Sequence, residues 1–417
     1  MFRKVIFRFH LSLAVAAGLF IATMAATGGV IACEDAVMSL AERSRRAVVP
    51  VEGRRLPPED LVAAAEEWGG ATDPSFAATS IEYRPGPGAA VQVHAGRGRR
   101  VFVDPWTGEA VGGGFPFLEG FFAGVRGWHR WLGMSGSGVR TGRALTGAAN
   151  VAFLFLLLTG PLLWIPRPVT RGALARNILP RRRVAGPSRQ LNRHRVIGIW
   201  SFLPLLAISA TGIVMSYPAV GDRAYGVVGA AMPGGGGVEE GTVASRRSGP
   251  GGPGVQGAPG EGIGLAGALA AASALVPGWR SIALAIPGPG RARIRAEVRT
   301  GRAGQPQKAS VVVVDRRSGE ALAVESFRDE PRSHRAREFL HYAHTGEYWG
   351  LAGQALAAIF ALAAVAMVWT GFSVALAVFR PRRPKRRSRL PVRRSSRGEG
   401  PRHASAGSAA DPPKPNR

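Results

Sequence analysis

Four long stretches without Asp, Glu, Lys or Arg constrain the fold of this chain more than any other feature. They comprise 25 residues between Arg8 and Glu34, 23 between Arg143 and Arg167, 26 between Arg195 and Asp222, and 32 between Glu347 and Arg380. A helix of about 20 apolar residues crosses the ~30 Å hydrocarbon core of a bilayer. The sequence therefore predicts an α-helical membrane protein with four transmembrane helices, and it excludes a soluble cytosolic protein.

The basic residues predict how these helices are oriented. The chain has 417 residues and a formal net charge of +27, and Lys and Arg gather in residues 1–10, 166–195 and 380–417. Basic residues that flank spans stay on the cytoplasmic side. We therefore expect a multi-pass protein of the bacterial inner (cytoplasmic) membrane with both termini cytoplasmic. Membrane lipid is an expected partner and nucleic acid is not, because no base-reading motif accompanies the basic blocks.

These observations divide the chain into alternating spans and loops. The expected segments are a cytoplasmic N-terminus at 1–10, spans at 11–33, 144–166, 196–218 and 351–379, external regions at 34–128 and 219–340 with a Gly/Pro linker at 231–262, interfacial segments at 129–143 and 341–350, a basic loop at 167–195, and a disordered basic cytoplasmic tail at 380–417. A basic start followed by an apolar run and Cys33 is also typical of a cleaved lipoprotein signal. The internal repeat argues against that alternative.

The two halves of the chain repeat one another. His10 and Thr27-Gly28 are separated by sixteen residues, and so are His194 and Thr211-Gly212. Further along, Thr159-Gly160 matches Thr370-Gly371 at an offset of 211 residues. The sequence therefore predicts two repeats, each ordered as span, external module and span.

Each external region has the pattern of a small α+β module. A short helical stretch, 57–68 or 266–275, precedes three β-type runs in each half. These runs are 79–84, 90–94 and 100–104 in the first half, and 281–286, 292–298 and 310–315 in the second. The segments 103–109 and 314–320 then read Val-Asp-x-x-Thr/Ser-Gly-Glu, which predicts a tight turn after the third run.

The order of these features along the chain resembles that of the PepSY-associated transmembrane proteins over about residues 5–383. The resemblance rests on the repeated pairs of spans, the Val-Asp-x-x-Ser/Thr-Gly-Glu turns, Trp128-His129-Arg130, His194-Arg195-x-x-Gly198-x-Trp200 and His344-Thr345-Gly346-Glu347. It implies PepSY-like external modules and the binding of haem b by membrane histidines. For some members it also implies the reduction of ferric siderophores during iron uptake.

Histidines at the ends of the spans are the candidate ligands of haem iron. We expect one or two haem b groups. Haem held by two histidines needs imidazoles from facing helices at the same depth. The topology supplies His10 and His194 on the cytoplasmic side, and it pairs His129 with His341 or His344 on the other side. The family's His-Thr-Gly-Glu motif favours His344 over His341. A lone histidine at an interface is otherwise an ordinary amphipathic anchor.

The leading hypothesis is a transmembrane electron conduit that acts as a ferric-siderophore reductase, an oxidoreductase. A cytoplasmic or quinol donor would supply the electrons, and a ferric siderophore would accept them outside. The alternative is a non-enzymatic membrane anchor whose external modules bind or inhibit a peptidase or signalling partner. A permease is disfavoured because the spans have few polar groups and no broken-helix pattern. The sequence leaves the oligomeric state open, a homodimer included.

Other site chemistries find little support in the sequence. The single cysteine, Cys33, excludes an intramolecular disulfide framework and a metal centre built on several cysteines. No His, Glu and Asp spacing matches a hydrolytic zinc site, and no motif matches a phosphate-binding loop. The catalytic residues of the reductase remain unassigned from sequence.

Overall fold

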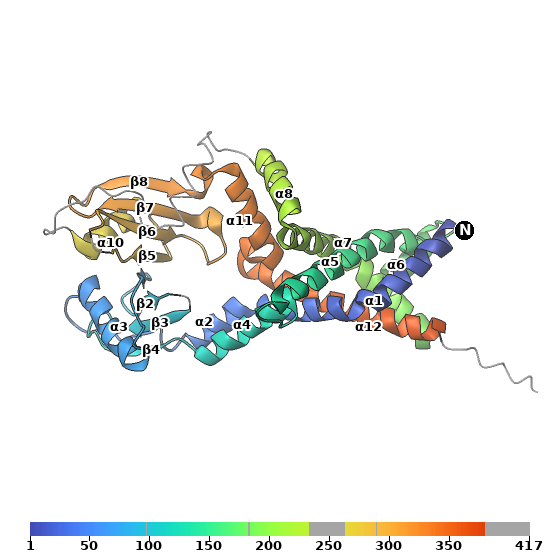
Figure 1. Cartoon of the computed structure of the whole chain (residues 1–417), viewed down its shortest axis with the longest axis horizontal. Coiled ribbons are helices and arrows are strands. Elements are labelled where there is room, and N and C mark those ends of the chain that lie inside the picture. Colours follow the sequence, from blue (N-terminus) through green and yellow to red (C-terminus); the bar gives the residue numbers. More distant parts are fainter. Residues whose placement is uncertain (97, 182–183, 233–262, 289, 380–417) are drawn as a thin grey trace, which may run out of the picture. The chain divides into compact units, whose positions relative to one another are not determined.

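The computed structural model describes residues 1–96, 98–181, 184–232, 263–288 and 290–379 (Figure 1). Within these ranges, four helices are long and apolar enough to cross a membrane: α1 (Phe2–Ile31), α5 (Gly138–Trp164), α7 (Gly186–Ser216) and α12 (Gly350–Phe379). Each of them overlaps one of the four expected spans. The tail at 380–417 and all but two residues of the linker at 231–262 lie outside the described residues.

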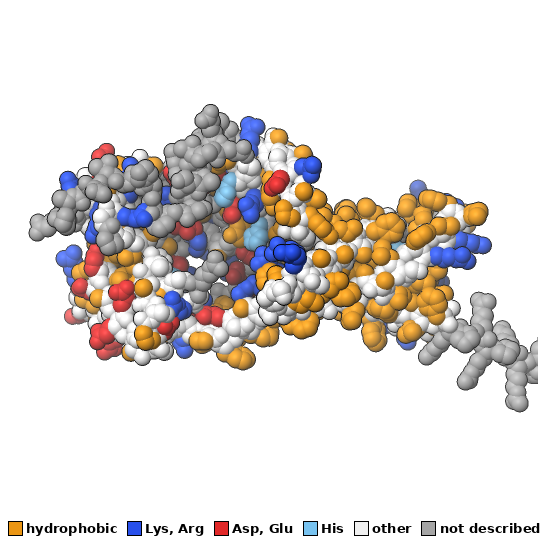
Figure 2. All heavy atoms as spheres, viewed as in Figure 1, with side chains coloured by type: hydrophobic (Ala, Val, Ile, Leu, Met, Phe, Trp, Pro, Cys, Tyr) orange, Lys and Arg blue, Asp and Glu red, His pale blue; other side chains and the backbone are white. Residues whose placement is uncertain are grey.

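The surface of these helices is apolar, as lipid-facing helices require. Leu203, Leu362 and Trp369 are each exposed over at least 65% of their surface. Figure 2 shows hydrophobic side chains covering this part of the molecule. Such an expanse of exposed apolar side chains is typical of a membrane-embedded surface rather than of a soluble one.

The helices begin earlier than the charge pattern predicts. Helix α7 starts at Gly186 and α1 at Phe2, so His194 and His10 lie inside continuous helices rather than at their first residues. The basic segment between α5 and α7 also contains a short helix, α6 (Arg171–Ile178), which begins with the Thr170 hydroxyl accepting a hydrogen bond from the N–H of Ala173. A helix tolerates Arg on an exposed turn, so the end of an uncharged run does not mark the end of the helix.

The described strands form one eight-stranded antiparallel sheet in the order β4-β3-β2-β1-β5-β6-β7-β8. The strands are β1 (Ser80–Tyr83), β2 (Val91–Ala95), β3 (Arg99–Val103), β4 (Ala110–Gly113), β5 (Ser281–Ala285), β6 (Arg293–Arg299), β7 (Ala309–Asp315) and β8 (Ala321–Ser326). Strand β1 pairs with β5, with Ile81 opposite Leu284. The sequence predicts two separate small modules, whereas the structure joins their strands edge to edge.

The reason for this union is a shared core on one face of the sheet. Helices α3 (Pro58–Thr72) and α10 (Gly264–Leu275) both pack on this face, and their apolar side chains form one cluster with residues from both sets of strands. Pairing β1 with β5 also satisfies two strand edges that two separate modules would leave open.

The structure has strands and turns at the predicted positions, and one further strand follows each turn. At the first turn the N–H of Gly108 donates to the carbonyl of Asp104, and Gly108 has a φ of 78°. Gly319 has the same role in the second turn, with a φ of 77°. The chain then reverses into β4 or β8. Strands β4 and β8 lack a run of β-branched residues, so their sequences did not predict them.

Four further helices occupy parts of the chain that the sequence analysis assigned to external or interfacial segments: α2 (Glu34–Ala41), α4 (Pro116–Trp131), α8 (Pro218–Ala231) and α11 (Arg332–Thr345). Helix α4 packs against α1 and α5, and α11 packs against α7 and α8. Helix α4 ends where Leu132 adopts a left-handed conformation, and α11 ends at left-handed Gly346. Each of the two therefore turns directly into the segment that leads to the following span.

Replacing Ile81 with alanine is expected to destabilise the joined sheet. Its side chain is fully buried opposite Leu284, and removing such a side chain from a core costs about 2–5 kcal/mol. The measurement is the thermal unfolding midpoint of the detergent-solubilised protein, which should fall. Leu322→Ala on edge strand β8 is the control, since this side chain is 46% exposed. Equal midpoints for the two variants would contradict a common core.

Candidate functional site

The structure places the four preferred histidines on four different helices. His10 lies on α1, His129 on α4, His194 on α7 and His344 on α11. Each is therefore held by a rigid element rather than by a loop. His129 and His344 occupy equivalent positions near the ends of α4 and α11, although the regular offset of 211 residues places Leu340 opposite His129.

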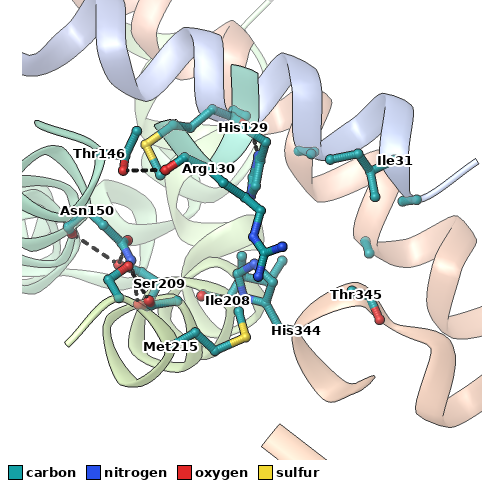
Figure 3. Close-up of a pocket in the computed structure, with 18 of the residues that line it drawn as sticks. Ile31, His129, Arg130, Thr146, Asn150, Ile208, Ser209, Met215, His344 and Thr345 are labelled. Carbon is teal, nitrogen blue, oxygen red and sulfur yellow. Dashed lines mark hydrogen bonds between the residues drawn. The ribbon is translucent and has the colours of Figure 1, made fainter. Parts of the chain in front are cut away.

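His129 and His344 face one another. Their ring centroids are 6.3 Å apart, and their ring planes are inclined at 58°. Both line a cavity of about 440 Å³ that lies among α1, α4, α5, α7, α11 and α12 (Figure 3). That volume is within the range of cofactor and ligand pockets.

Both imidazoles of this pair hydrogen bond to neighbouring helices through Nδ1. In His129, Nδ1 donates to the carbonyl of Met24 at 2.9 Å and lies 3.2 Å from Oγ1 of Thr27. In His344, Nδ1 donates to the carbonyl of Ile208 at 3.0 Å and lies 3.0 Å from Oγ1 of Thr211. These contacts fix each ring against a membrane-spanning helix.

Burial keeps both rings neutral. Removal from water lowers the pKa of His129, and it lowers the pKa of His344 to about 3, with the neighbouring His129 adding to the effect. An imidazole binds metal in its neutral form, since its lone pair is then free. The pair is therefore in the protonation state that metal binding needs.

His341 also lines the cavity, but its setting differs from that of His344. It lies nearly one turn earlier on α11, its side chain is exposed, and its ring packs edge-on against Tyr342 with centroids 5.0 Å apart. The structure thus brings His344, and not His341, against His129.

His10 and His194 form the second candidate pair. Nδ1 of His10 lies 2.8 Å from Oγ1 of Thr159 on α5. Nδ1 of His194 donates to the carbonyl of Met367 on α12 at 3.1 Å, and it lies 3.1 Å from Oγ1 of Thr370. Each ring of this candidate pair is therefore held against another span, and the pairing of His10 with His194 stays a prediction.

Charged side chains line part of the cavity that holds the His129–His344 pair. Arg126, Arg130 and Arg143 contribute to its wall, as do Glu34 and Glu347. Arg126 forms an ion pair with Glu34 at 2.5 Å. Figure 3 shows the side chain of Arg130 directed into the cavity. A ligand with an apolar body and carboxylate groups matches this mixture of apolar and basic walls.

Two features of the site escaped the sequence analysis. Buried Asn150 on α5 and Ser209 on α7 form a reciprocal contact, in which the Asn150 amide donates to the Ser209 carbonyl at 3.2 Å and the Ser209 hydroxyl donates to the Asn150 side-chain oxygen at 2.9 Å. A lone Asn in an apolar run was the available signal. The Thr-Gly dipeptides were noted only as marks of the repeat, and their contact with histidines was missed.

The fold and its histidines define a class of protein: a four-span membrane protein that holds paired imidazoles between its helices and has an eight-stranded sheet outside them. Residues 7–377 match the family described as the PepSY-associated TM region. The chain belongs to this family. No curated protein sequence matches the chain.

Proposed function

We propose that this protein binds one or two haem b groups in a bacterial inner membrane and carries electrons across it to reduce a ferric chelate, such as a siderophore, during iron uptake. The observation that carries the proposal is the His129–His344 pair, with ring centroids 6.3 Å apart in a cavity of about 440 Å³. Family membership supports it, because paired membrane histidines are what the resemblance implies for haem binding.

The spacing of the two rings suits a single metal ion between them. Imidazoles that bind one metal from opposite sides, each at about 2 Å from the nitrogen, have ring centroids about 6 Å apart. The observed 6.3 Å agrees with that value. Two histidine side chains would be enough to hold a haem iron. The residues present therefore fit the group.

In this proposal each part of the chain has a defined role. His129 with His344, and His10 with His194, would hold haem iron, which supplies one-electron transfer. The helices bury these sites and exclude water, and the arginines of the cavity wall would bind carboxylates. A cytoplasmic or quinol donor loses one electron, and Fe(III) of the chelate gains it. Hard oxygen chelators hold Fe(II) less tightly than Fe(III), so reduction releases the iron.

The direction of transfer follows from the proposed orientation. Both termini and the basic segment before α7 would be cytoplasmic, because Lys and Arg gather there. The His10–His194 pair would then lie toward the cytoplasm, and the His129–His344 pair would lie toward the sheet. An anionic chelate would be received on the outer side.

A visible spectrum tests the proposal directly. Protein purified in detergent after expression with ample haem should give a Soret band and an α band in the dithionite-reduced minus oxidised difference spectrum. Membranes from cells without the protein, taken through the same purification, are the control. A purified protein without these bands would refute haem binding and, with it, electron transfer.

One observation favours a second candidate, a membrane anchor whose sheet binds a peptidase or signalling partner. Strands β4 and β8 are the two edges of the described sheet, and an edge strand can pair with an extended segment of another protein. The same spectrum separates the candidates, because an anchor needs no haem.

A further inference from the structure

We propose that four of the Thr-Gly dipeptides in the spans are positioning elements for the ligand histidines, namely those that begin at Thr27, Thr159, Thr211 and Thr370. The threonine hydroxyl of each accepts the Nδ1 hydrogen of one imidazole and so presents Nε2 to the iron. The inference rests on the proposed function for the identity of the metal group. The hydrogen bonds between threonines and histidines belong to this chain alone, so this part of the inference can be tested without haem.

One arrangement occurs four times. Every preferred histidine has its Nδ1 next to the threonine of a Thr-Gly dipeptide on a different helix. The pairs are His10 with Thr159, His129 with Thr27, His194 with Thr370 and His344 with Thr211, at distances of 2.8, 3.2, 3.1 and 3.0 Å. Each repeat of the chain therefore contains two such contacts.

The hydroxyl hydrogens decide which partner donates. Each of these threonines donates to the carbonyl four residues earlier in its own helix: Thr27 to Thr23, Thr159 to Phe155, Thr211 to Ala207 and Thr370 to Ala366, at 2.7 to 2.9 Å. A hydroxyl has one hydrogen and two lone pairs. With this hydrogen directed to the helix, the oxygen has lone pairs left to accept from the imidazole.

Backbone carbonyls lead to the same conclusion at three of the four sites. The carbonyls of Met24, Ile208 and Met367 are acceptors, and each lies within 3.1 Å of an Nδ1. Each belongs to the residue three positions before the threonine. Nδ1 therefore carries the hydrogen, and the neutral ring keeps its lone pair on Nε2. A ligand histidine needs that tautomer.

The glycine of the dipeptide provides room for the ring. A Cβ atom at Gly28 would lie 3.1 Å from Cε1 of His129, and one at Gly212 would lie 3.3 Å from Cε1 of His344. At Gly371 the distance to Cε1 of His194 is 3.6 Å. Gly160 is the exception, since its Cβ would meet nothing within 4 Å. A distance of 3.6 Å is an ordinary van der Waals contact, so the dipeptide combines an acceptor with space for the imidazole at the His129–His344 pair only.

Threonine often bonds to its own helix without any further role, and the chain provides an example. Thr23 on α1 donates to the carbonyl of Leu19 at 3.0 Å, and this contact is exposed. Among the described residues, its hydroxyl forms no hydrogen bond with a histidine. Thr23 is therefore a matched control on one of the same helices.

His10 provides the sharpest test because Thr159 is its only hydrogen-bond partner among the described residues, whereas His194 also has the Met367 carbonyl. Thr159→Val keeps the shape of the side chain and removes the acceptor. Losing a hydrogen-bond partner of a ligand histidine weakens metal binding about 10-fold or more. It also makes the imidazole a weaker electron donor, which raises the reduction potential of the iron that it binds.

The experiment compares five full-length proteins: the natural sequence, Thr159→Val, Thr159→Ser, Thr370→Val and Thr23→Val. We expect Thr159→Val to lower haem affinity at one site about 10-fold and to raise one midpoint potential in a spectroscopic redox titration. Thr159→Ser should restore both values, Thr370→Val should have a smaller effect, and Thr23→Val should have none. A Thr159→Val protein with natural affinity and potentials, or a Thr23→Val protein with the same shifts, would overturn the inference.

A second measurement uses the haem-free protein. Side-chain ¹⁵N chemical shifts of histidine distinguish the two neutral tautomers, and we expect the Nδ1–H form for all four ligand histidines. His10 should lose this preference in Thr159→Val. The Nε2–H form in the natural sequence would overturn the inference even if the protein bound no haem. If Thr159→Val failed to fold, the tautomers of the four histidines in the natural sequence would still test the inference.

Discussion

Replacing His344 with alanine is expected to abolish haem binding at the His129–His344 pair, so that a protein with two haems retains one. In the proposal, His344 supplies one of the two imidazoles. It is half-buried against α7, and its Nδ1 donates to the carbonyl of Ile208. An alanine there offers the iron no ligand. Haem per protein, measured as the pyridine haemochrome of purified samples, gives the result.

His341→Ala is the matched control for this prediction. The two histidines share α11 and both line the cavity, but only His344 faces His129 at 6.3 Å. His341→Ala should therefore keep the haem content of the natural sequence. If His341→Ala lost a haem and His344→Ala kept it, the assignment of ligands at this pair would be reversed.

Replacing His10 with alanine is expected to stop electron transfer across the membrane while the His129–His344 pair keeps its haem. In the proposed orientation His10 and His194 receive electrons from the cytoplasmic side. Without His10 that site has one imidazole left, and the donor has no partner at that face of the membrane. Intact cells should then reduce an external ferric chelate no faster than cells without the protein.

The readout is Fe(II) trapped outside the cells by a coloured chelator. Phe9→Ala is the control, because Phe9 neighbours His10 on α1 and is 64% exposed. Dithionite added to purified His10→Ala protein should still reduce the remaining haem. Reduction of the chelate by His10→Ala cells at the natural rate would show that this pair is not on the path of the electrons.

Local patterns gave the elements of the fold, and the structure shows why they succeeded. Uncharged runs predicted α1, α5, α7 and α12 because a helix in lipid cannot expose charge over its length. Alternating β-branched runs predicted six strands, and the turns at Gly108 and Gly319 were predicted because they need a positive φ. The edge strands β4 and β8 and the helices α4 and α11 lack such marks, so they were missed.

The pairing of elements was harder to predict. Nothing local distinguishes two small sheets from one sheet joined at β1 and β5, because the join is made by edge hydrogen bonds and a common core. The choice between His341 and His344 depended on a family motif. His341 and His344 are three residues apart on α11, and the structure shows that the ring of His344 is the one that lies 6.3 Å from that of His129.

The sequence by itself determined that this membrane protein has four stretches long and apolar enough to span a bilayer, that its halves repeat, and which histidines are the candidates beside those stretches. These properties follow from hydropathy, charge and spacing, which are local in the chain. Only the tertiary structure decided that each of four histidines meets a Thr-Gly dipeptide on another helix, and that His129 and His344 face one another across a cavity. Contacts between residues more than 100 positions apart depend on how the helices pack, and helix packing leaves no local mark in a sequence.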